Sequence, residues 1–212
     1  MPLSVMRLAV VLALLATLAA CGGKPQAVQA PPSDPRYAET VDGGIVIPAV
    51  DPGYLVGSNA RTEVTYTGGD APGTIVVDPH ARVLYLVQEG GTAVRYGIAV
   101  GREGYGFSGN ANVRRKEMWP SWTPTANMIR RDPQKNLKYA GGVPGGLGNP
   151  LGARAMYLYR GGHDTNFRIH GTNQPSSIGY AMSSGCIRML NHDVIDLYGR
   201  AGVGTRVYVI QA

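Results

Sequence analysis

The chain has 212 residues, a formal net charge of +6 and 16% charged residues. This length allows one sizeable hydrophobic core, because single domains commonly run to about 100–200 residues. The positive charge is too small and too dispersed to indicate a nucleic-acid-binding protein, although it suits contact with anionic polymers. The sequence therefore predicts one main domain that binds no nucleic acid.

The N-terminus has the pattern of a targeting segment. Arg7 is followed by a nearly unbroken run of apolar and small residues. The run is too short to span a bilayer, so we expect a signal peptide at residues 1–20. It ends in Leu18-Ala19-Ala20-Cys21, which resembles the bacterial lipobox, in which the cysteine is lipidated. The alternative is an ordinary secretory signal that leaves Cys21 as a thiol.

The chain has two cysteines, so lipidation of Cys21 excludes a disulfide between it and Cys186. Beyond the membrane the compartment is oxidising, where a reduced thiol is a liability unless it is used. Cys186 is then either a nucleophile or an inert cysteine that packs as a small hydrophobe.

Composition divides the chain into three parts. Residues 22–35 are rich in Pro, Ala and Gln without apolar periodicity, which is typical of a flexible tether. Residues 36–70 carry one short apolar stretch, and we expect them to pack against the main domain. We therefore assign residues 21–72 to a tether and N-terminal extension, and residues 73–212 to the main domain.

Within residues 73–212, short branched and aromatic runs between Gly- and Pro-rich turns predict a mostly β domain. Strands are predicted at residues 74–78, 83–88, 92–100, 153–159, 166–170 and 205–210. One short helix is predicted to start with Asn191 as N-cap and to end at Gly202, because apolar residues between them fall at helical spacing.

Residues 101–150 are dense in Gly, Pro and Asn, and we expect them to be irregular. An irregular stretch of this length indicates a functional loop or lid. Its aromatic side chains either line a substrate groove or anchor the loop to the core, and they are Tyr105, Phe107, Trp119, Trp122 and Tyr139.

The residues around Cys186 point to nucleophilic chemistry. His170 lies sixteen positions before Cys186, and a neighbouring imidazole can take the proton of a thiol. Gly185 leaves room for a substrate carbonyl, and the backbone N–H groups of residues 184–186 can form an oxyanion hole. His170 also needs an acceptor for its other ring nitrogen, and the backbone carbonyl of Gly171 can serve.

Two segments, IHGTN at residues 169–173 and SSGCIRM at residues 183–189, together resemble the L,D-transpeptidase catalytic domain, also called the YkuD domain. The resemblance covers residues 73–212 and includes shorter segments at residues 75–78, 83–86, 122–124 and 149–152. It implies a mostly β, barrel- or sandwich-like fold with one short helix towards the C-terminus and a long irregular loop.

The resemblance implies an enzyme of bacterial cell-wall biogenesis and cell shape that uses no cofactor and no metal. The Cys186 thiolate would attack the carbonyl of the third residue of a peptidoglycan tetrapeptide stem, and the terminal D-Ala would leave. An amine of another stem would then give a 3→3 cross-link, and a lysine of an envelope protein would give protein anchoring. Water in place of the amine would make the enzyme an L,D-carboxypeptidase.

By the same resemblance, the expected catalytic residues are Cys186, His170, Gly171, Ser184, Gly185 and Arg188. Arg188 either binds substrate carboxylates and organises the site, or pairs with a core carboxylate. Many family members have His where this chain has Ser184, but members with Ser also occur. The expected substrate-binding residues are Trp122, Tyr139, Asn173 and Ser183.

Two other interpretations remain. One is a non-catalytic lipoprotein that binds peptidoglycan through the same groove, and the other is a thiol peptidase of papain or sortase type. His163 and His192 are expected at the surface, and the spacing of His163, His170 and Cys186 fits no structural zinc pattern.

A lipid on Cys21 would place the protein in the cell envelope, facing the periplasm. The residue after the cysteine is Gly22, whereas an Asp at this position would keep a lipoprotein in the inner membrane. The sorting rule known for some Gram-negative envelopes therefore favours the outer membrane.

Overall fold

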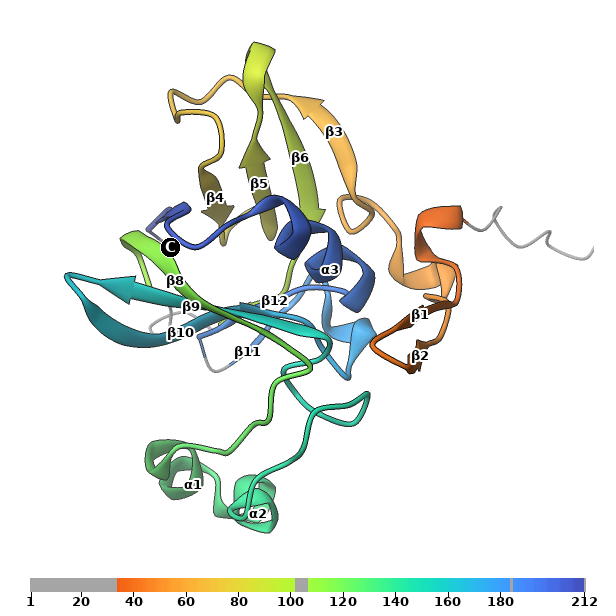
Figure 1. Cartoon of the computed structure of the whole chain (residues 1–212), viewed down its shortest axis with the longest axis vertical. Coiled ribbons are helices and arrows are strands. Elements are labelled where there is room, and N and C mark those ends of the chain that lie inside the picture. Colours follow the sequence, from red (N-terminus) through yellow and green to blue (C-terminus); the bar gives the residue numbers. More distant parts are fainter. Residues whose placement is uncertain (1–33, 102–106, 184, 212) are drawn as a thin grey trace, which may run out of the picture. The chain divides into compact units, whose positions relative to one another are not determined.

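The structure, a computed structural model, describes residues 34–101, 107–183 and 185–211. Its main element is a nine-stranded sheet (Figure 1). In spatial order the strands are β12 (Ile187–Arg188), β10 (His163–His170), β9 (Arg154–Arg160), β8 (Gly109–Met118), β13 (Arg206–Val209), β4 (Ile75–Asp78), β5 (Val83–Val87), β6 (Thr92–Gly97) and β3 (Thr62–Thr65). Two further pairs are β1 (Thr40–Asp42) with β2 (Ile45–Ile47), and β7 (Val100–Gly101) with β11 (Ala181–Ser183).

The predicted mostly β fold is confirmed, and all six predicted strands are present with ends shifted by up to three residues. The strongest signals came from runs such as Ile75-Val76-Val77, whose three side chains are all buried. Most neighbouring strands are antiparallel, but β13 pairs with β4, and β10 with β12, in parallel. The parallel pair at the β12 edge brings the end of β10 next to the residues that follow Cys186.

The prediction that residues 101–150 are irregular is wrong for residues 109–118. These residues form β8, which lies inside the sheet between β9 and β13. β8 buries Ala111 and Val113, while most of its other side chains are Asn, Arg, Lys and Glu. A strand with few branched residues has a weak period-two signal, which explains why its composition indicated a loop.

The rest of the connection between β8 and β9 contains two short helices, α1 (Ala126–Arg131) and α2 (Pro133–Asn136), and a 3-10 turn at Leu137–Tyr139. Figure 1 shows α1 and α2 at the far end of this connection, away from the strands. A backbone bridge between Trp122 and Val143 ties its two arms together. Thr125 is the N-cap of α1, since its side chain accepts from the backbone N–H of Met128.

Helix α3 (Asn191–Arg200) packs on the sheet and closes the core. Val194 and Leu197 are fully buried in one cluster with core residues of β4, β5 and β9. Lys116 of β8 donates to the carbonyl oxygens of Tyr198 and Ala201 at 2.7 and 2.6 Å. These bonds satisfy carbonyl groups that the C-terminal turn of a helix leaves without intrahelical donors.

The prediction that Asn191 is the N-cap of this helix is wrong. The N-cap is Leu190, and no side chain makes a cap hydrogen bond there. The Asn191 side chain instead bonds to backbone groups of Ala153 and Thr172, outside the helix. The Asn191 side chain therefore makes tertiary hydrogen bonds instead of the helix cap that the local sequence predicted.

The N-terminal extension packs closely on the rest of the unit. Asp42 of β1 holds the Arg154 guanidinium with two hydrogen bonds of 2.6 and 2.7 Å, and it also accepts from the Trp119 ring at 2.8 Å. β3 pairs with β6, so the main sheet includes residues that precede position 73. The structure places residues 36–70 against the main domain, as the sequence predicts.

The prediction that His192 lies at the surface is wrong, because the extension covers it. His192 is 8% exposed, and its Nε2 pairs with the carbonyl oxygen of Ala38 at 2.8 Å. Its ring also packs against Tyr37. His163, by contrast, is exposed at the start of β10, as expected.

Within the described ranges, none of the helices has the length and apolar character that crossing a bilayer requires. The signal peptide and Cys21 lie outside the described residues.

Candidate active site

Cys186 lies between β11 and β12, directly after a backbone turn that requires glycine. Gly185 has φ = 122°, a conformation that side-chain-bearing residues rarely adopt. Gly101 of β7 packs against the same turn, and a Cβ at Gly101 would lie 2.6 Å from the Cα of Gly185. Gly185 therefore determines the direction in which the chain enters Cys186. This is a second role beside the one predicted from the sequence, which was to leave room for a substrate carbonyl.

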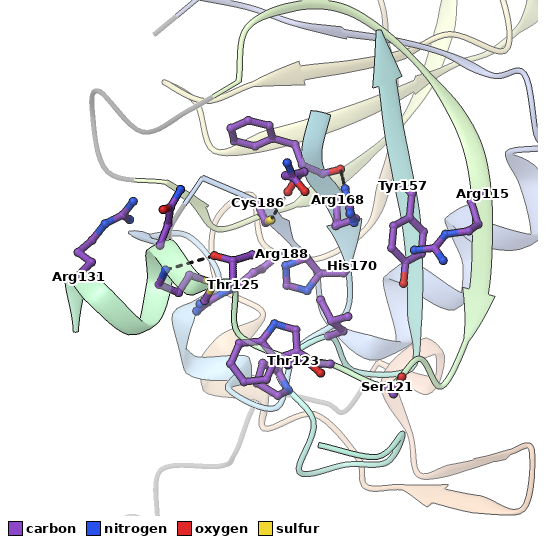
Figure 2. Close-up of a pocket in the computed structure, with 17 residues that line it drawn as sticks. Arg115, Ser121, Thr123, Thr125, Arg131, Tyr157, Arg168, His170, Cys186 and Arg188 are labelled. Carbon is purple, nitrogen blue, oxygen red and sulfur yellow. Dashed lines mark hydrogen bonds between the residues drawn. The ribbon is translucent and has the colours of Figure 1, made fainter. Parts of the chain in front are cut away.

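His170 ends β10 and faces the same cavity as Cys186. The parallel register of β10 and β12 pairs His170 with Arg188, and the Met189 N–H donates to the His170 carbonyl at 2.8 Å. Cys186, His170 and Arg188 all line a cavity of about 510 Å³. Figure 2 shows the Cys186 and His170 side chains directed into it. The sheet thus brings together residues that are sixteen positions apart in the chain.

The His170 ring has one defined partner on its Nδ1 side. Nδ1 lies 2.6 Å from the carbonyl oxygen of Gly171, which is the contact that the sequence analysis expected. A carbonyl oxygen only accepts hydrogen bonds, so this contact favours the tautomer with the proton on Nδ1. The backbone of Pro150 makes a second hydrogen bond with the ring. This tautomer is the one that a general base needs if Nε2 faces the nucleophile.

Burial keeps His170 uncharged. The side chain is 4% exposed, and burial together with the nearby positive charge of Arg188 lowers its pKa to about 3. Both effects disfavour the imidazolium form. In the resting site His170 is therefore a neutral imidazole at any physiological pH.

Burial also keeps the proton on Cys186. It raises the pKa of the thiol, and the positive charges of Arg168 and Arg188 offset only part of this rise. Sγ lies 3.9 Å from the carbonyl oxygen of Asn166, a long contact of the kind a weak S–H donor makes. Asn166 has φ = 61° at a register shift in β10, and this irregularity directs its carbonyl towards the thiol.

Four arginines line the cavity, namely Arg115, Arg131, Arg168 and Arg188. Arg168 is held by Asp164 through hydrogen bonds of 2.7 and 2.9 Å, and Arg115 pairs with Glu117 at 3.0 Å. Within the described ranges, the Arg188 guanidinium has no hydrogen-bonded or ion-paired partner, and burial lowers its pKa. A charge held in a cavity in this way is suited to a carboxylate from outside the protein.

Tyr157 forms the wall between two of these arginines. The Arg115 and Arg168 guanidinium carbons lie 3.6 and 4.3 Å from the centre of its ring, and its hydroxyl donates to Glu117 at 2.7 Å. This stack fixes the direction of both guanidinium groups. The chemistry available in the cavity is thus a thiol, a neutral base and several fixed positive charges.

Among the described residues, no group of three His, Cys, Asp or Glu side chains is placed to hold a metal ion. His163 is exposed at the opposite end of β10 from His170, so these two histidines do not share a site.

Comparison with known proteins assigns the family. The model of the L,D-transpeptidase catalytic domain family YkuD matches residues 72–209. The chain belongs to this family. The probable L,D-transpeptidase ErfK/SrfK of Escherichia coli K12 is 35% identical over 140 residues, which are 65% of this chain and 44% of that protein. The chain therefore spans less than half the length of that relative.

Two further comparisons cover a similar share of this chain. A putative L,D-transpeptidase of Fuscovulum blasticum is 36% identical over 143 residues, which are 64% of this chain and 68% of that protein. A crystal structure from Brucella melitensis, described as a probable carnitine operon oxidoreductase, matches with a TM-score of 0.50 and 52% identity over 72% of this chain and 94% of that chain. The oxidoreductase description refers to the Brucella protein.

Within this L,D-transpeptidase-family domain, the expected substrate-binding residues separate into two groups. Trp122 lines the cavity. Tyr139 contacts Trp122 with ring centres 5.9 Å apart but is not among the lining residues. Asn173 is exposed and donates to the carbonyl of Gly148 at 3.0 Å. Tyr139 and Asn173 therefore make contacts within the loop around the cavity and do not line the cavity itself.

Two predicted residues of the cysteine motif are placed only in part or not at all. The backbone of Ser183 in β11 pairs with Gly101 in β7. The Ser183 side chain is not among the described parts of the structure. Ser184 lies outside the described residues, so its role and the oxyanion hole stay predictions.

The aromatic residues of the long connection have mixed roles. Phe107 packs on Phe167 at the edge of the core, and Trp119 is anchored by Asp42. Trp122 alone among the described ones lines the cavity. Tyr105 lies outside the described residues. Anchoring is therefore the more common role, and groove lining is confined to one residue.

Sequence reasoning missed Asn166 and Arg168, which line the cavity beside His170. A signal for Arg168 was present, because residues 168 and 170 alternate along a predicted strand and alternate residues share a face. Asn166 lies at the irregularity in β10, which no alternation pattern predicts. Arg131, by contrast, enters the cavity from α1 in the long connection, and no local pattern marks it.

Proposed function

We propose that this protein is a cysteine-dependent peptidoglycan L,D-transpeptidase, with Cys186 as nucleophile and His170 as general base. The observation that carries the proposal is the convergence of a thiol and a neutral imidazole of fixed tautomer in one cavity. The positive charges of that cavity suit the carboxylates of a tetrapeptide stem.

The proposed acylation step uses these two side chains. His170 Nε2 takes the thiol proton as Sγ bonds to the carbonyl carbon of the third stem residue. The bond to the terminal D-Ala then breaks, and the imidazolium returns its proton to the leaving amine. The product is a thioester on Cys186, with His170 neutral again.

Substrate charge would assist this proton transfer. Arg188 is one of the causes of the low pKa of His170. A stem carboxylate bound to the Arg188 guanidinium would neutralise that positive charge, and the pKa of His170 would rise. The base would thus strengthen when an anionic substrate is in place.

Deacylation runs the same steps in reverse with an acceptor. The acceptor amine loses its proton to His170, attacks the thioester carbonyl, and releases the Cys186 thiolate, which is reprotonated. An amine from another stem gives a 3→3 cross-link, and an envelope-protein lysine gives an anchored protein. Water would make the enzyme an L,D-carboxypeptidase.

We also propose that Cys21 carries a lipid that anchors the protein in the outer membrane, facing the periplasm. The support is the sequence Leu18-Ala19-Ala20-Cys21-Gly22 after an apolar run. Intact mass of the mature protein from membranes, with Cys21→Ala as control, tests this. Absence of a lipid-sized mass increase would contradict it.

The test of the enzymatic proposal is incubation of the purified protein with disaccharide-tetrapeptide, with products read by mass spectrometry. We expect loss of D-Ala and formation of a dimer or tripeptide, and neither with Cys186→Ala. The product also identifies the acceptor as amine or water. Unchanged substrate with folded protein would favour a non-catalytic peptidoglycan-binding role.

A further inference from the structure

Asn191 makes three side-chain hydrogen bonds to backbone groups directly behind the active site. Its Oδ1 accepts from the N–H groups of Ala153 and Thr172 at 3.0 and 3.1 Å. Its Nδ2 donates to the carbonyl of Thr172 at 3.0 Å. One side chain thus joins the start of α3, the residue before β9 and the chain that leaves β10.

The surrounding chain is built to bring this side chain close. A Cβ at Gly152 or at Gly171 would overlap the Oδ1 of Asn191. Gly152 also has φ = 61°, which favours glycine. Both glycines therefore make room for the bonds of Asn191, which no residue with a side chain would allow at these positions.

The group that Asn191 fixes is the one that orients His170. Gly171 is bonded through its N–H to the Arg154 carbonyl at 3.0 Å, and the next residue, Thr172, is held on both its N–H and its carbonyl by Asn191. The Gly171 carbonyl between them has little freedom to rotate. This is the carbonyl that accepts the Nδ1 proton of His170 at 2.6 Å.

We propose that Asn191 is a positioning residue for His170. By holding the Gly171 carbonyl in place, it keeps the proton on Nδ1 and leaves Nε2 as the acceptor. The effect on turnover rests on the proposed function, whereas the effect on the tautomer does not. A helix-capping role does not account for the side chain, because α3 makes no use of it.

The test uses ¹⁵N NMR of the histidine rings without substrate and kinetics of D-Ala release. In the wild type we expect His170 in the single Nδ1–H tautomer. In Asn191→Ala we expect loss of that single form. We also expect kcat to fall about 10- to 100-fold with KM changed little, since small displacements of a catalytic group have effects of this size.

A second variant covers the case in which Asn191→Ala does not fold. Asp at position 191 has the size of Asn but no N–H, so the Thr172 carbonyl would face a carboxylate oxygen instead of a donor. We expect Asn191→Asp to show a mixed His170 tautomer and a smaller loss of kcat. A folded variant of either kind that keeps the Nδ1–H tautomer would overturn the proposal.

Asn59→Ala is the matched control. Asn59 also donates to two backbone carbonyls, those of Tyr54 and Ile178 at 3.0 and 3.3 Å, and also packs against a glycine, Gly179. It has no contact with the His170 segment, so its loss should leave the His170 signals unchanged. If the wild type releases no D-Ala, the proposed function fails, while the tautomer comparison still decides this inference.

Discussion

At the scale of single residues, the pKa shifts of the two candidate reacting side chains, Cys186 and His170, both favour the uncharged form. Burial raises the pKa of Cys186 and lowers that of His170. A thiolate–imidazolium pair, which some thiol enzymes maintain at rest, would need the opposite shifts. Under the proposed function, the thiol proton would therefore move only when the substrate is attacked.

This state predicts the pH dependence of thiol alkylation. A raised pKa means that the thiolate fraction of Cys186 grows about tenfold per pH unit throughout the range from pH 6 to 9. We expect the rate of reaction with iodoacetamide to keep rising over this range. Peptide mass spectrometry measures the rate at Cys186 separately from Cys21. A rate that is already constant below pH 7 would show a resting ion pair instead.

Part of the site could be predicted from residues alone. Cys186, His170 and the Gly171 carbonyl followed from the chemistry that a thiol nucleophile needs and from the resemblance of two short segments. Arg131 could not be predicted, because α1 reaches the cavity only through the folding of the long connection. The charge states of Cys186 and His170 could not be predicted either, since they depend on how deeply the side chains are buried.

At the scale of elements, the site depends on a close contact between two strand ends. Gly101 at the end of β7 touches the Gly185 turn, which leads into Cys186. The φ of Gly101 is not in the left-handed region, so only this contact opposes a side chain at Gly101. The direction of Cys186 is therefore sensitive to a single methyl group.

Gly101→Ala is expected to lower the rate of Cys186 acylation about tenfold or more, because the added Cβ must push the Gly185 turn away. The free energy of unfolding should fall by about 1–3 kcal/mol, the usual cost of overpacking. Acylation by tetrapeptide and thermal unfolding measure the two effects. Gly141→Ala is the control, as its Cβ would meet open space. Equal acylation rates in both variants would contradict the expectation.

Elements differed in how well the sequence predicted them. β4, β5 and β6 are rich in branched and aromatic residues and were recognised, whereas β8 has polar side chains at most positions and was not. The start of α3 was predicted nearly correctly for the wrong reason, since Asn191 bonds to other segments. Local patterns specify elements when their own side chains form the core, and fail when partners supply the stabilising contacts.

At the scale of the whole molecule, the N-terminal extension and α3 meet in a buried ionic cluster. Asp193 is fully buried, accepts from the Tyr37 hydroxyl at 3.2 Å and lies 4.0 Å from Arg61. Arg61 makes its closer ion pair with Asp196, at 2.9 Å. Burial outweighs these partners and raises the pKa of Asp193 to about 7.

The sign of the resulting pH effect on stability is determined by this shift. An unfolded Asp has a pKa of about 3.9, so between pH 4 and 7 the folded protein holds a proton that the unfolded chain has lost. The contribution of Asp193 to folding is therefore fully present below pH 4 and is lost as the pH rises through 7. His170 acts in the opposite direction, because its folded pKa of about 3 disfavours the folded state as the pH falls below 6.5.

Asp193→Asn separates the two effects, since it removes one titration and leaves the His170 titration unchanged. We expect the stability of this variant, relative to the wild type, to increase by roughly 1 kcal/mol per pH unit between pH 4 and 7. Urea unfolding at pH 4, 5, 6 and 7 measures it. Asp196→Asn is the matched control: burial raises the pKa of Asp196, but hydrogen bonds from Arg200 and Tyr96 outweigh this and lower it overall. Its effect on stability should therefore be constant above pH 4, and a pH-independent difference for Asp193→Asn as well would show that Asp193 is charged when folded.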